Sequence, residues 1–243
     1  MLKFNSEEIT MIRNIFFDLD ETLFDFTKAE RIALKSTLEH FGAPSEDAVL
    51  QRYHVINIEH WKRLEKGEIT RQQVKIGRYE QLFKELGFNG IDALSVTSYY
   101  EGRLAIGHFF IDGTEEMLNS LFGKYRLFLV TNGTKKVQDG RIESSGIAKF
   151  FNSIFISESV GFDKPDKRFF ESCFSQIPDF SKQESIIIGD SLTSDILGGK
   201  NCGIKTAWFN KNNLENKTDI IPDYEFNNLN QIKALIEKIN AEN

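Results

Sequence analysis

Residues 15–22 read IFFDLDET, an apolar run that ends directly in a pair of aspartates. The run has the length of a strand and is apolar at successive positions, as expected for a central strand of a parallel sheet covered by helices on both faces. Runs of the same kind lie further along the chain, at residues 127–130, 154–156, 186–188 and, less purely apolar, 206–209. Helical patterns separate these later runs, so the sequence predicts an α/β fold with a doubly wound, Rossmann-like parallel sheet.

Local signals predict where three of the connecting helices begin or end. Asp112 and Glu115 have the spacing of a capping box at the start of a helix. Pro165 is expected to start a second helix, and Gly203 is expected to end a third.

Residues 26–107 interrupt the alternation of strands and helices, because they show helical periodicity and no convincing strand. Turns that contain glycine divide this stretch into about four helices. The sequence therefore predicts a small all-helical cap domain, residues 26–107, inserted after the first strand of a core domain. That core consists of residues 1–25 and 108–243.

The composition excludes several classes of partner. The 243 residues carry 30 Lys and Arg against 36 Asp and Glu, a net charge of −6, which makes a nucleic-acid polymer or an anionic membrane a poor partner. No apolar run reaches the ~20 residues of a membrane-spanning helix, and residues 1–11 lack the basic and apolar blocks of a secretory signal. Cys173 and Cys202 have no metal-ligand spacing and are expected to be small buried residues. We expect a cytoplasmic protein, either a monomer or a homodimer.

Polar residues follow each of the first four predicted strands at its carboxyl end. They are Asp18 and Asp20 after the first, Thr131-Asn132-Gly133 after the second, Lys164 after the third, and Asp190, with Asp195 shortly beyond it, after the fourth. Ligands of open parallel sheets bind outside these strand ends. Each residue alone can be explained as a solvated turn or a helix cap, but their shared place at one edge favours a binding site.

Carboxylates gathered at one edge repel one another unless a cation lies between them. Hard oxygen ligands without paired His or Cys favour Mg²⁺ over zinc. Lys164 precedes Pro165, which holds it extended before the next helix and directs it toward the carboxylates.

Four motifs of this chain resemble, in the same order, those of the haloacid dehalogenase superfamily, subfamily I. The motifs are residues 18–22 (DLDET), Thr131, Lys164 and Gly189-Asp190 with Asp195. The resemblance covers residues 12–209 and implies that the helical insert is the small cap of that family.

A second set of matches resembles the YjjG/YfnB-type branch of the superfamily. In the core these are residues 130–133, Arg141, 145–146, 156–158, 160–161, 164–165 and 195–199, and in the cap Asn57, Trp61, 67–70 and Arg78. This resemblance implies hydrolysis of nucleoside 5′-monophosphates, with pyrimidine nucleotides favoured. Trp61 could stack on a nucleobase, but an aromatic residue in a helical stripe more often belongs to the core.

The resemblance also implies a role for each motif residue in Mg²⁺-dependent hydrolysis of a small phosphomonoester. Asp18 is the expected nucleophile, which forms an aspartyl-phosphate, and Asp20 is the expected general acid and base. Thr131 and Lys164 are also expected catalytic residues, Thr131 by holding the phosphoryl oxygens and Lys164 by neutralising the nucleophile and the transferring group. The residues expected to bind the substrate are Thr131, Asn132, Gly133 and Lys164. The expected metal ligands are the Asp18 carboxylate, the Asp20 main-chain carbonyl and Asp190, with Asp195 either a further ligand or an anchor behind the ligands.

Several alternatives stay open at this point. Asp20 favours a phosphatase over a dehalogenase, because release of a halide needs no proton donor. A phosphosugar phosphatase and a phosphomutase would use the same core. A receiver-like signalling module also combines Asp, Thr and Lys with Mg²⁺, but its phosphate-accepting Asp ends the third strand rather than the first. A non-catalytic binding protein would have no use for Asp20.

Overall fold

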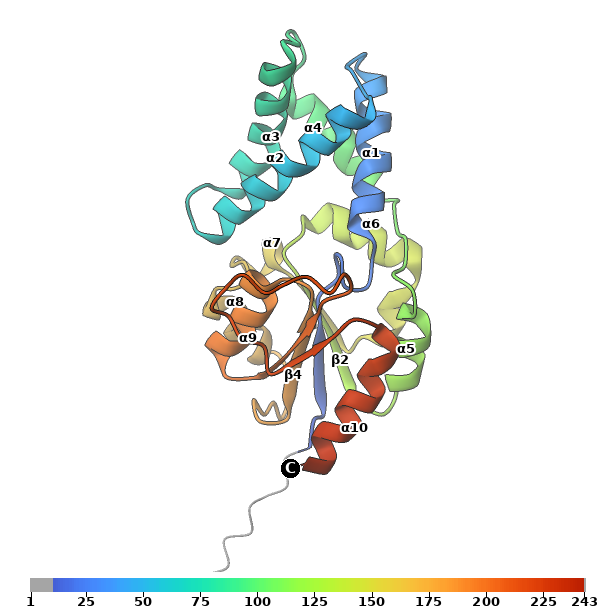
Figure 1. Ribbon diagram of the computed structural model, residues 1–243, viewed down its shortest axis with the longest axis vertical. Helices are drawn as coiled ribbons and strands as arrows, with labels where there is room; N and C mark the ends of the chain where they lie inside the picture. The colour runs from blue at the N-terminus through green and yellow to red at the C-terminus, as the bar shows by residue number, and fades with distance from the viewer. Residues whose placement is uncertain (1–10, 243) are drawn as a thin grey trace, which may run out of the picture.

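The computed structural model describes residues 11–242, so the predictions for residues 1–10 lie outside the described part. Its core is a six-stranded parallel sheet in the order β3-β2-β1-β4-β5-β6 (Figure 1). The strands are β1 (Asn14–Phe17), β2 (Arg126–Thr131), β3 (Ser153–Ile156), β4 (Ser185–Gly189), β5 (Lys205–Phe209) and β6 (Tyr224–Phe226). The predicted doubly wound fold and its five strands are confirmed. This strand order differs from the 2-1-3-4-5 order of receiver-type sheets, so the receiver-like alternative is wrong.

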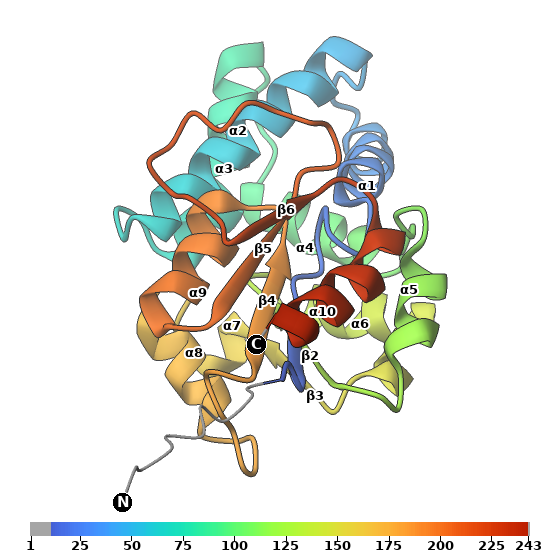
Figure 2. The same ribbon diagram turned by 60° about the horizontal axis from the view of Figure 1, so that its bottom comes forward.

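The strands of the core are buried on both faces. Ile15 and Phe17 of β1 pack in one apolar cluster with α5 (Thr114–Leu121) and α10 (Ile232–Glu242). Phe16 packs in another cluster, with α8 (Lys167–Phe174) and α9 (Leu197–Cys202). Because a strand alternates its side chains between two faces, a run that is apolar at every position needs helices on both sides, and Figure 2 shows them there.

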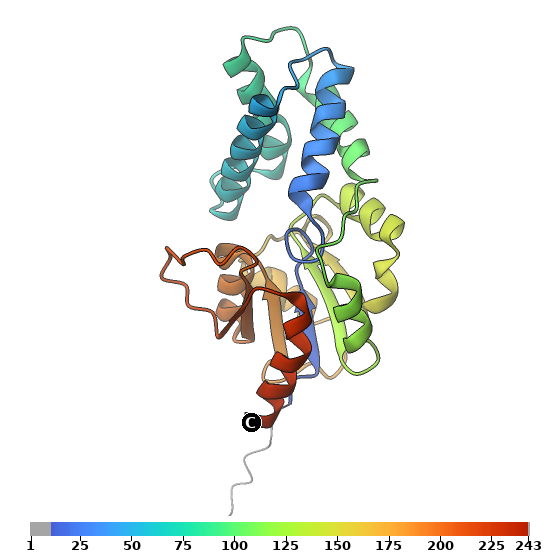
Figure 3. The same ribbon diagram turned by 45° about the vertical axis from the view of Figure 1, so that its right-hand side comes forward.

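Residues 26–107 fold as a bundle of four helices above the sheet (Figure 3). They are α1 (Phe26–His40), α2 (Asp47–Glu65), α3 (Arg71–Leu86) and α4 (Ala93–Leu104). Their apolar stripes form a hydrophobic cluster of their own, which Val137 of α6 (Lys135–Ser145) joins from the core. This separate cluster supports the division into a core and a cap, whose boundaries stay a prediction.

Two of the predicted helix starts are wrong. Helix α5 begins after Gly113, whose left-handed φ of 86° makes the turn, so the side chain of Asp112 does not cap it. Helix α8 begins at Lys167, two residues after Pro165, and is capped by Asp166. The predicted end of α9 at Gly203, with a left-handed φ of 74°, is confirmed. The remaining short elements are α7 (Ser157–Val160), a π-helical turn (Leu192–Ile196) and two 3₁₀ turns (Ile147–Phe150 and Leu229–Gln231).

The sheet order brings distant parts of the sequence together at the edge that lies under the cap. Strands β1 and β4 are neighbours, and the Asp18 amide donates a hydrogen bond of 2.9 Å to the carbonyl of Ile188. Asp18 and Asp190 therefore follow adjacent strands at their carboxyl ends. Within residues 11–242, no helix combines the length and the apolar character needed to cross a membrane.

Candidate active site

Asp18 lies at the end of β1 and is 7% exposed. Its Oδ1 is 2.6 Å from the Nζ of Lys164. Burial raises the pKa of Asp18 to about 7, with Asp195 and Asp20 adding to the rise and Lys164 opposing it. An ammonium group is therefore the main protein group that favours the ionised form of this carboxylate.

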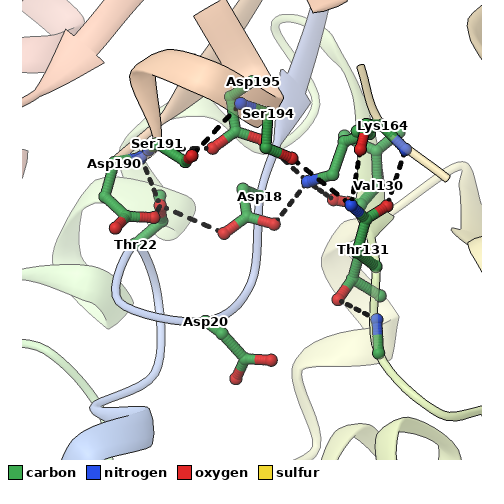
Figure 4. Close-up of polar contacts among 12 residues, drawn as sticks. Asp18, Asp20, Thr22, Val130, Thr131, Lys164, Asp190, Ser191, Ser194 and Asp195 are labelled. Atoms are coloured by element: carbon green, nitrogen blue, oxygen red, sulfur yellow. Dashed lines mark hydrogen bonds and ion pairs between the residues drawn. The ribbon is translucent and has the colours of Figure 1, made fainter. Parts of the chain in front are cut away.

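Lys164 is held by three acceptors that match the three protons of its ammonium group. Its Nζ donates to Asp18 Oδ1 at 2.6 Å, to Asp195 Oδ1 at 2.7 Å and to the carbonyl of Val130 at 2.9 Å (Figure 4). The side chain of Asn132 clamps the backbone of Lys164, because its Nδ2 donates to the Lys164 carbonyl and its Oδ1 accepts from the Lys164 amide, both at 2.8 Å. The Asn132 side chain thus positions Lys164 and is not itself available to a ligand.

Three carboxylates, two of them buried and one half-buried, form an acidic cluster that fits a divalent cation. Asp18, Asp190 and Asp195 each offer an oxygen, and these oxygens lie within 4.8 Å of one another. Thr22 joins the first two, with its hydroxyl 3.4 Å from Asp18 Oδ2 and 3.5 Å from Asp190 Oδ1. Burial and the neighbouring carboxylates raise the pKa of Asp190. A hard cation such as Mg²⁺ would relieve this crowding, and the all-oxygen donor set suits it.

Asp195 is engaged on both oxygens. Its Oδ1 accepts from Lys164, and its Oδ2 accepts from the amide of Ser191 at 3.1 Å (Figure 4). Gly189 leaves room for this arrangement, because a Cβ at that position would come within 2.2 Å of Asp195 Oδ2. These contacts favour the second of the two predicted roles for Asp195, an anchor behind the ligands.

The raised pKa of Asp18 predicts how Mg²⁺ should affect stability. The folded protein without metal keeps a proton on Asp18 up to about pH 7, whereas the unfolded chain loses it near pH 4. Stability of the metal-free protein should therefore fall as the pH rises from about 4 to about 7. We expect Mg²⁺ to raise the melting temperature more at pH 8 than at pH 5, where it has to displace protons. Thermal unfolding in EDTA or in Mg²⁺ measures this, and equal shifts at both pH values would contradict it.

Asp20 is the second carboxylate of the site, and it lies apart from the acidic cluster (Figure 4). Its Oδ2 accepts from Gln138 Nε2 at 2.7 Å, and its Oδ1 is paired with Nη1 of Arg141. Arg141 is fully buried, and its Nε donates to the carbonyl of Gly107 at 2.9 Å. The orientation of Asp20 is thus set by α6 and by the chain segment that returns from the cap.

The loop after β2 presents a hydroxyl and backbone amides at the same edge. Thr131 Oγ1 accepts from Gln138 Nε2 at 2.9 Å and from the Gly133 amide at 3.3 Å, which leaves its own proton free to donate to a ligand. Gly133 is required here, because a Cβ would come within 2.2 Å of the Gln138 side chain.

All of the residues predicted for the site line one cavity of about 210 Å³. Those residues are Asp18, Asp20, Thr131, Asn132, Gly133, Lys164, Asp190 and Asp195. The cap contributes the roof, which includes the half-buried Trp61. Gln138 and Glu65 also line the cavity, and neither was predicted from the sequence. Gln138 could have been predicted, because it is a polar residue next to Val137 on the buried face of α6.

The cap is tied to the loops beneath it by polar contacts. Arg71, at the start of α3, donates to the carbonyl of Asn132 at 3.0 Å and to Ser157 Oγ at 2.7 Å, and it is paired with Asp163. Thr193 donates to Glu65 of α2 at 3.1 Å. These contacts join the cap to the loops after β2, β3 and β4.

Comparisons with known proteins agree with this geometry. Residues 15–209 match the family model described as haloacid dehalogenase-like hydrolase. The chain is 38% identical to the pyrimidine 5′-nucleotidase PynA of Streptococcus pneumoniae, with 93% of this chain and 97% of that protein covered. It is 30% identical to the pyrimidine 5′-nucleotidase YjjG of Escherichia coli, with 92% and 97% covered. The crystal structure of the HAD-hydrolase YfnB of Bacillus subtilis, which was solved bound to magnesium and shows interdomain movement, is similar with a TM-score of 0.88 and 37% identity over 93% of this chain and 99% of that one.

Proposed function

Because the chain belongs to the haloacid dehalogenase-like hydrolases, we propose that it hydrolyses nucleoside 5′-monophosphates, with pyrimidine nucleotides preferred, in a Mg²⁺-dependent reaction through an aspartyl-phosphate on Asp18. The relatives PynA and YjjG, both pyrimidine 5′-nucleotidases, support the substrate class. The acidic cluster supports the metal. The proposed location is the cytoplasm, and this rests on the sequence composition.

The observation that carries this proposal is the pairing of Asp18 with Lys164 in a cavity that also contains Asp20. The ammonium group of Lys164 favours the ionised, nucleophilic form of the buried Asp18 carboxylate as a dianionic phosphate approaches. A second carboxylate with its own hydrogen-bond partners can serve as the proton donor and acceptor of the reaction. Hydrolysis of a phosphomonoester needs both groups.

In the first step, an Asp18 oxygen attacks phosphorus and the bond from phosphorus to the ester oxygen breaks. Asp20, in its protonated form, gives its proton to the leaving oxygen, so that a neutral alcohol departs. Lys164, the Thr131 hydroxyl and the amides that follow it stabilise the negative charge on the transferring group. Mg²⁺ held by Asp18, Asp190 and the Asp20 carbonyl would supply further charge neutralisation when bound.

In the second step, Asp20 is a carboxylate and accepts a proton from water as the water oxygen attacks phosphorus. The bond between phosphorus and Asp18 breaks, which releases inorganic phosphate and restores the Asp18 carboxylate. Gln138 and Arg141 keep Asp20 at the place where both proton transfers occur.

A panel of phosphomonoesters tests the proposed function. We expect UMP and CMP to give the highest kcat/KM in Mg²⁺, above AMP, ribose 5-phosphate and glucose 6-phosphate, and we expect EDTA to abolish turnover. A ranking led by the sugar phosphates would replace the nucleotidase by the phosphosugar alternative. Formation of a new phosphate ester instead of inorganic phosphate would indicate a mutase.

Asp20→Asn should separate substrates by their leaving groups. The variant cannot protonate the leaving oxygen, so hydrolysis of UMP should fall by ~10²–10⁴-fold. The first step with p-nitrophenyl phosphate should fall far less, because its leaving group needs little protonation. Burst-phase kinetics measure that step by itself. Asp139→Asn changes an exposed aspartate of α6 and controls for general effects. Equal losses on both substrates would contradict the role of Asp20.

A further inference from the structure

Arg78 of α3 is a cation buried inside the cap. It is 5% exposed, and its guanidinium carbon lies 5.8, 5.2 and 5.0 Å from the ring centres of Tyr53, Tyr79 and Tyr100. Among the described residues, no carboxylate lies within ion-pair distance of this guanidinium. A buried arginine is normally paired, because removing its charge from water is costly.

The hydrogen bonds of Arg78 are also incomplete. Its Nη1 donates to Asn57 Oδ1 at 2.8 Å, while its buried Nε has no partner among the described residues. Asn57 is held in turn by Glu30, whose Oε1 accepts from Asn57 Nδ2 at 2.7 Å. A guanidinium has five N–H donors. Asn57 accepts from one of them, and the three tyrosine rings contact the charge, so most of the donors have no acceptor among the described residues.

The unused donors of Arg78 belong to a side chain that lines the cavity of the active site. The same cavity has the acidic cluster and Lys164 in the core, and Arg78, Tyr100 and Trp61 in the cap. The core end thus suits a phosphate. The cap end combines aromatic surfaces with the donors of Arg78 and with two carboxylates, Glu65 and Glu101. A flat ring with a carbonyl oxygen on its edge fits that end.

We propose that Arg78 is the residue that selects the base, by donating to the C2 keto oxygen of a pyrimidine nucleotide. This inference rests on the proposed nucleotidase function. Uracil, cytosine and thymine share that oxygen, whereas adenine has no keto group. The carbonyl supplies the acceptor that Arg78 lacks, and the neighbouring rings cover the faces of the base.

The test combines a substrate change with an enzyme change. In the wild-type enzyme, 2-thio-UMP, whose sulfur is a weak acceptor, should have a kcat/KM roughly 10-fold below that of UMP, while 4-thio-UMP stays close to UMP. Arg78→Met keeps the apolar stem and removes the donors, so it should lower kcat/KM for UMP by roughly 10- to 100-fold and abolish the difference between UMP and 2-thio-UMP. Turnover of ribose 5-phosphate should stay within about threefold.

Tyr79→Phe is the matched control, because Tyr79 belongs to the same cluster of rings but does not line the cavity. It should leave the ratio of UMP to 2-thio-UMP unchanged, even where the melting temperature falls. If Arg78→Met lowers turnover of all substrates equally, or if wild-type enzyme uses 2-thio-UMP as well as UMP, the assignment of Arg78 is overturned. The comparison of UMP with 2-thio-UMP in the wild-type enzyme tests the proposal even if Arg78→Met does not fold. If wild-type enzyme does not prefer UMP to ribose 5-phosphate, the proposed function itself fails.

Discussion

Asp18→Asn should reduce turnover of every phosphomonoester by roughly 10⁴- to 10⁶-fold, the scale on which enzymes lose activity with their nucleophile. The substitution keeps the size of the side chain but removes the charge that attacks phosphorus. It also removes one of the negative charges beside Lys164, without opening a cavity. Steady-state kinetics with UMP and with p-nitrophenyl phosphate measure the loss, which should be the same for both.

A control variant and a direct label complete this test. Asp139→Asn changes an exposed aspartate on α6 and should keep full activity. Wild-type enzyme quenched during turnover of ³²P-labelled substrate should carry phosphate on Asp18, identified by mass spectrometry after borohydride reduction. Phosphate on another residue, or substantial activity in Asp18→Asn, would rule out the proposed covalent mechanism.

Lys164→Met should impair both activity and stability. Activity should fall by at least ~10²–10³-fold, because the transferring group loses a preorganised positive charge. Without metal at pH 8, the free energy of unfolding should fall by about 3–5 kcal/mol, because Asp18 and Asp195 stay buried after their shared cation is removed. The loss should be smaller at pH 5, where Asp18 can take up a proton in the folded state.

Chemical denaturation at the two pH values measures the stability part. Lys167→Met removes an exposed lysine paired with Glu171 at 3.1 Å, and it should change the free energy of unfolding by less than about 0.5 kcal/mol. A drop of equal size at pH 5 and pH 8 would mean that Lys164 stabilises the fold by packing and not by its charge.

The core was predictable because each strand carries its own local signal. The runs at residues 15–17 and 186–188 are apolar at every position, which only a strand buried on both faces requires. Strand β6 has no such run, since its three residues change from partly buried to exposed to buried, and pairing with β5 is what makes it a strand. Asp112 shows the opposite failure, a capping pattern overridden by the left-handed turn at Gly113.

The site was predictable for residues at strand ends and not for residues on helices. Parallel strands that end together bring Asp18, Thr131 and Asp190 to one edge without any knowledge of packing. Gln138 and Glu65 reach the cavity only because α6 and α2 are placed beside it by tertiary contacts, which a helical pattern does not specify. The incomplete hydrogen bonding of Arg78 is likewise a property of the folded cap. From the sequence alone, an arginine is expected to be an exposed charge.

The contact between Arg141 and the Gly107 carbonyl limits how far the two parts of this enzyme can be exchanged with those of a relative. The core contributes Asp20, Gln138 and Arg141. The carbonyl that fixes the Arg141 guanidinium belongs instead to Gly107, in the segment where the chain leaves the cap. A chimaera that takes both its cap and its exit segment from a relative would place the carbonyl equivalent to that of Gly107 differently. Arg141 would then shift, and Asp20, the proton donor, would be misaligned. A graft that ends before Gly107 retains the native acceptor, so the transferable module is the helical bundle without its exit segment.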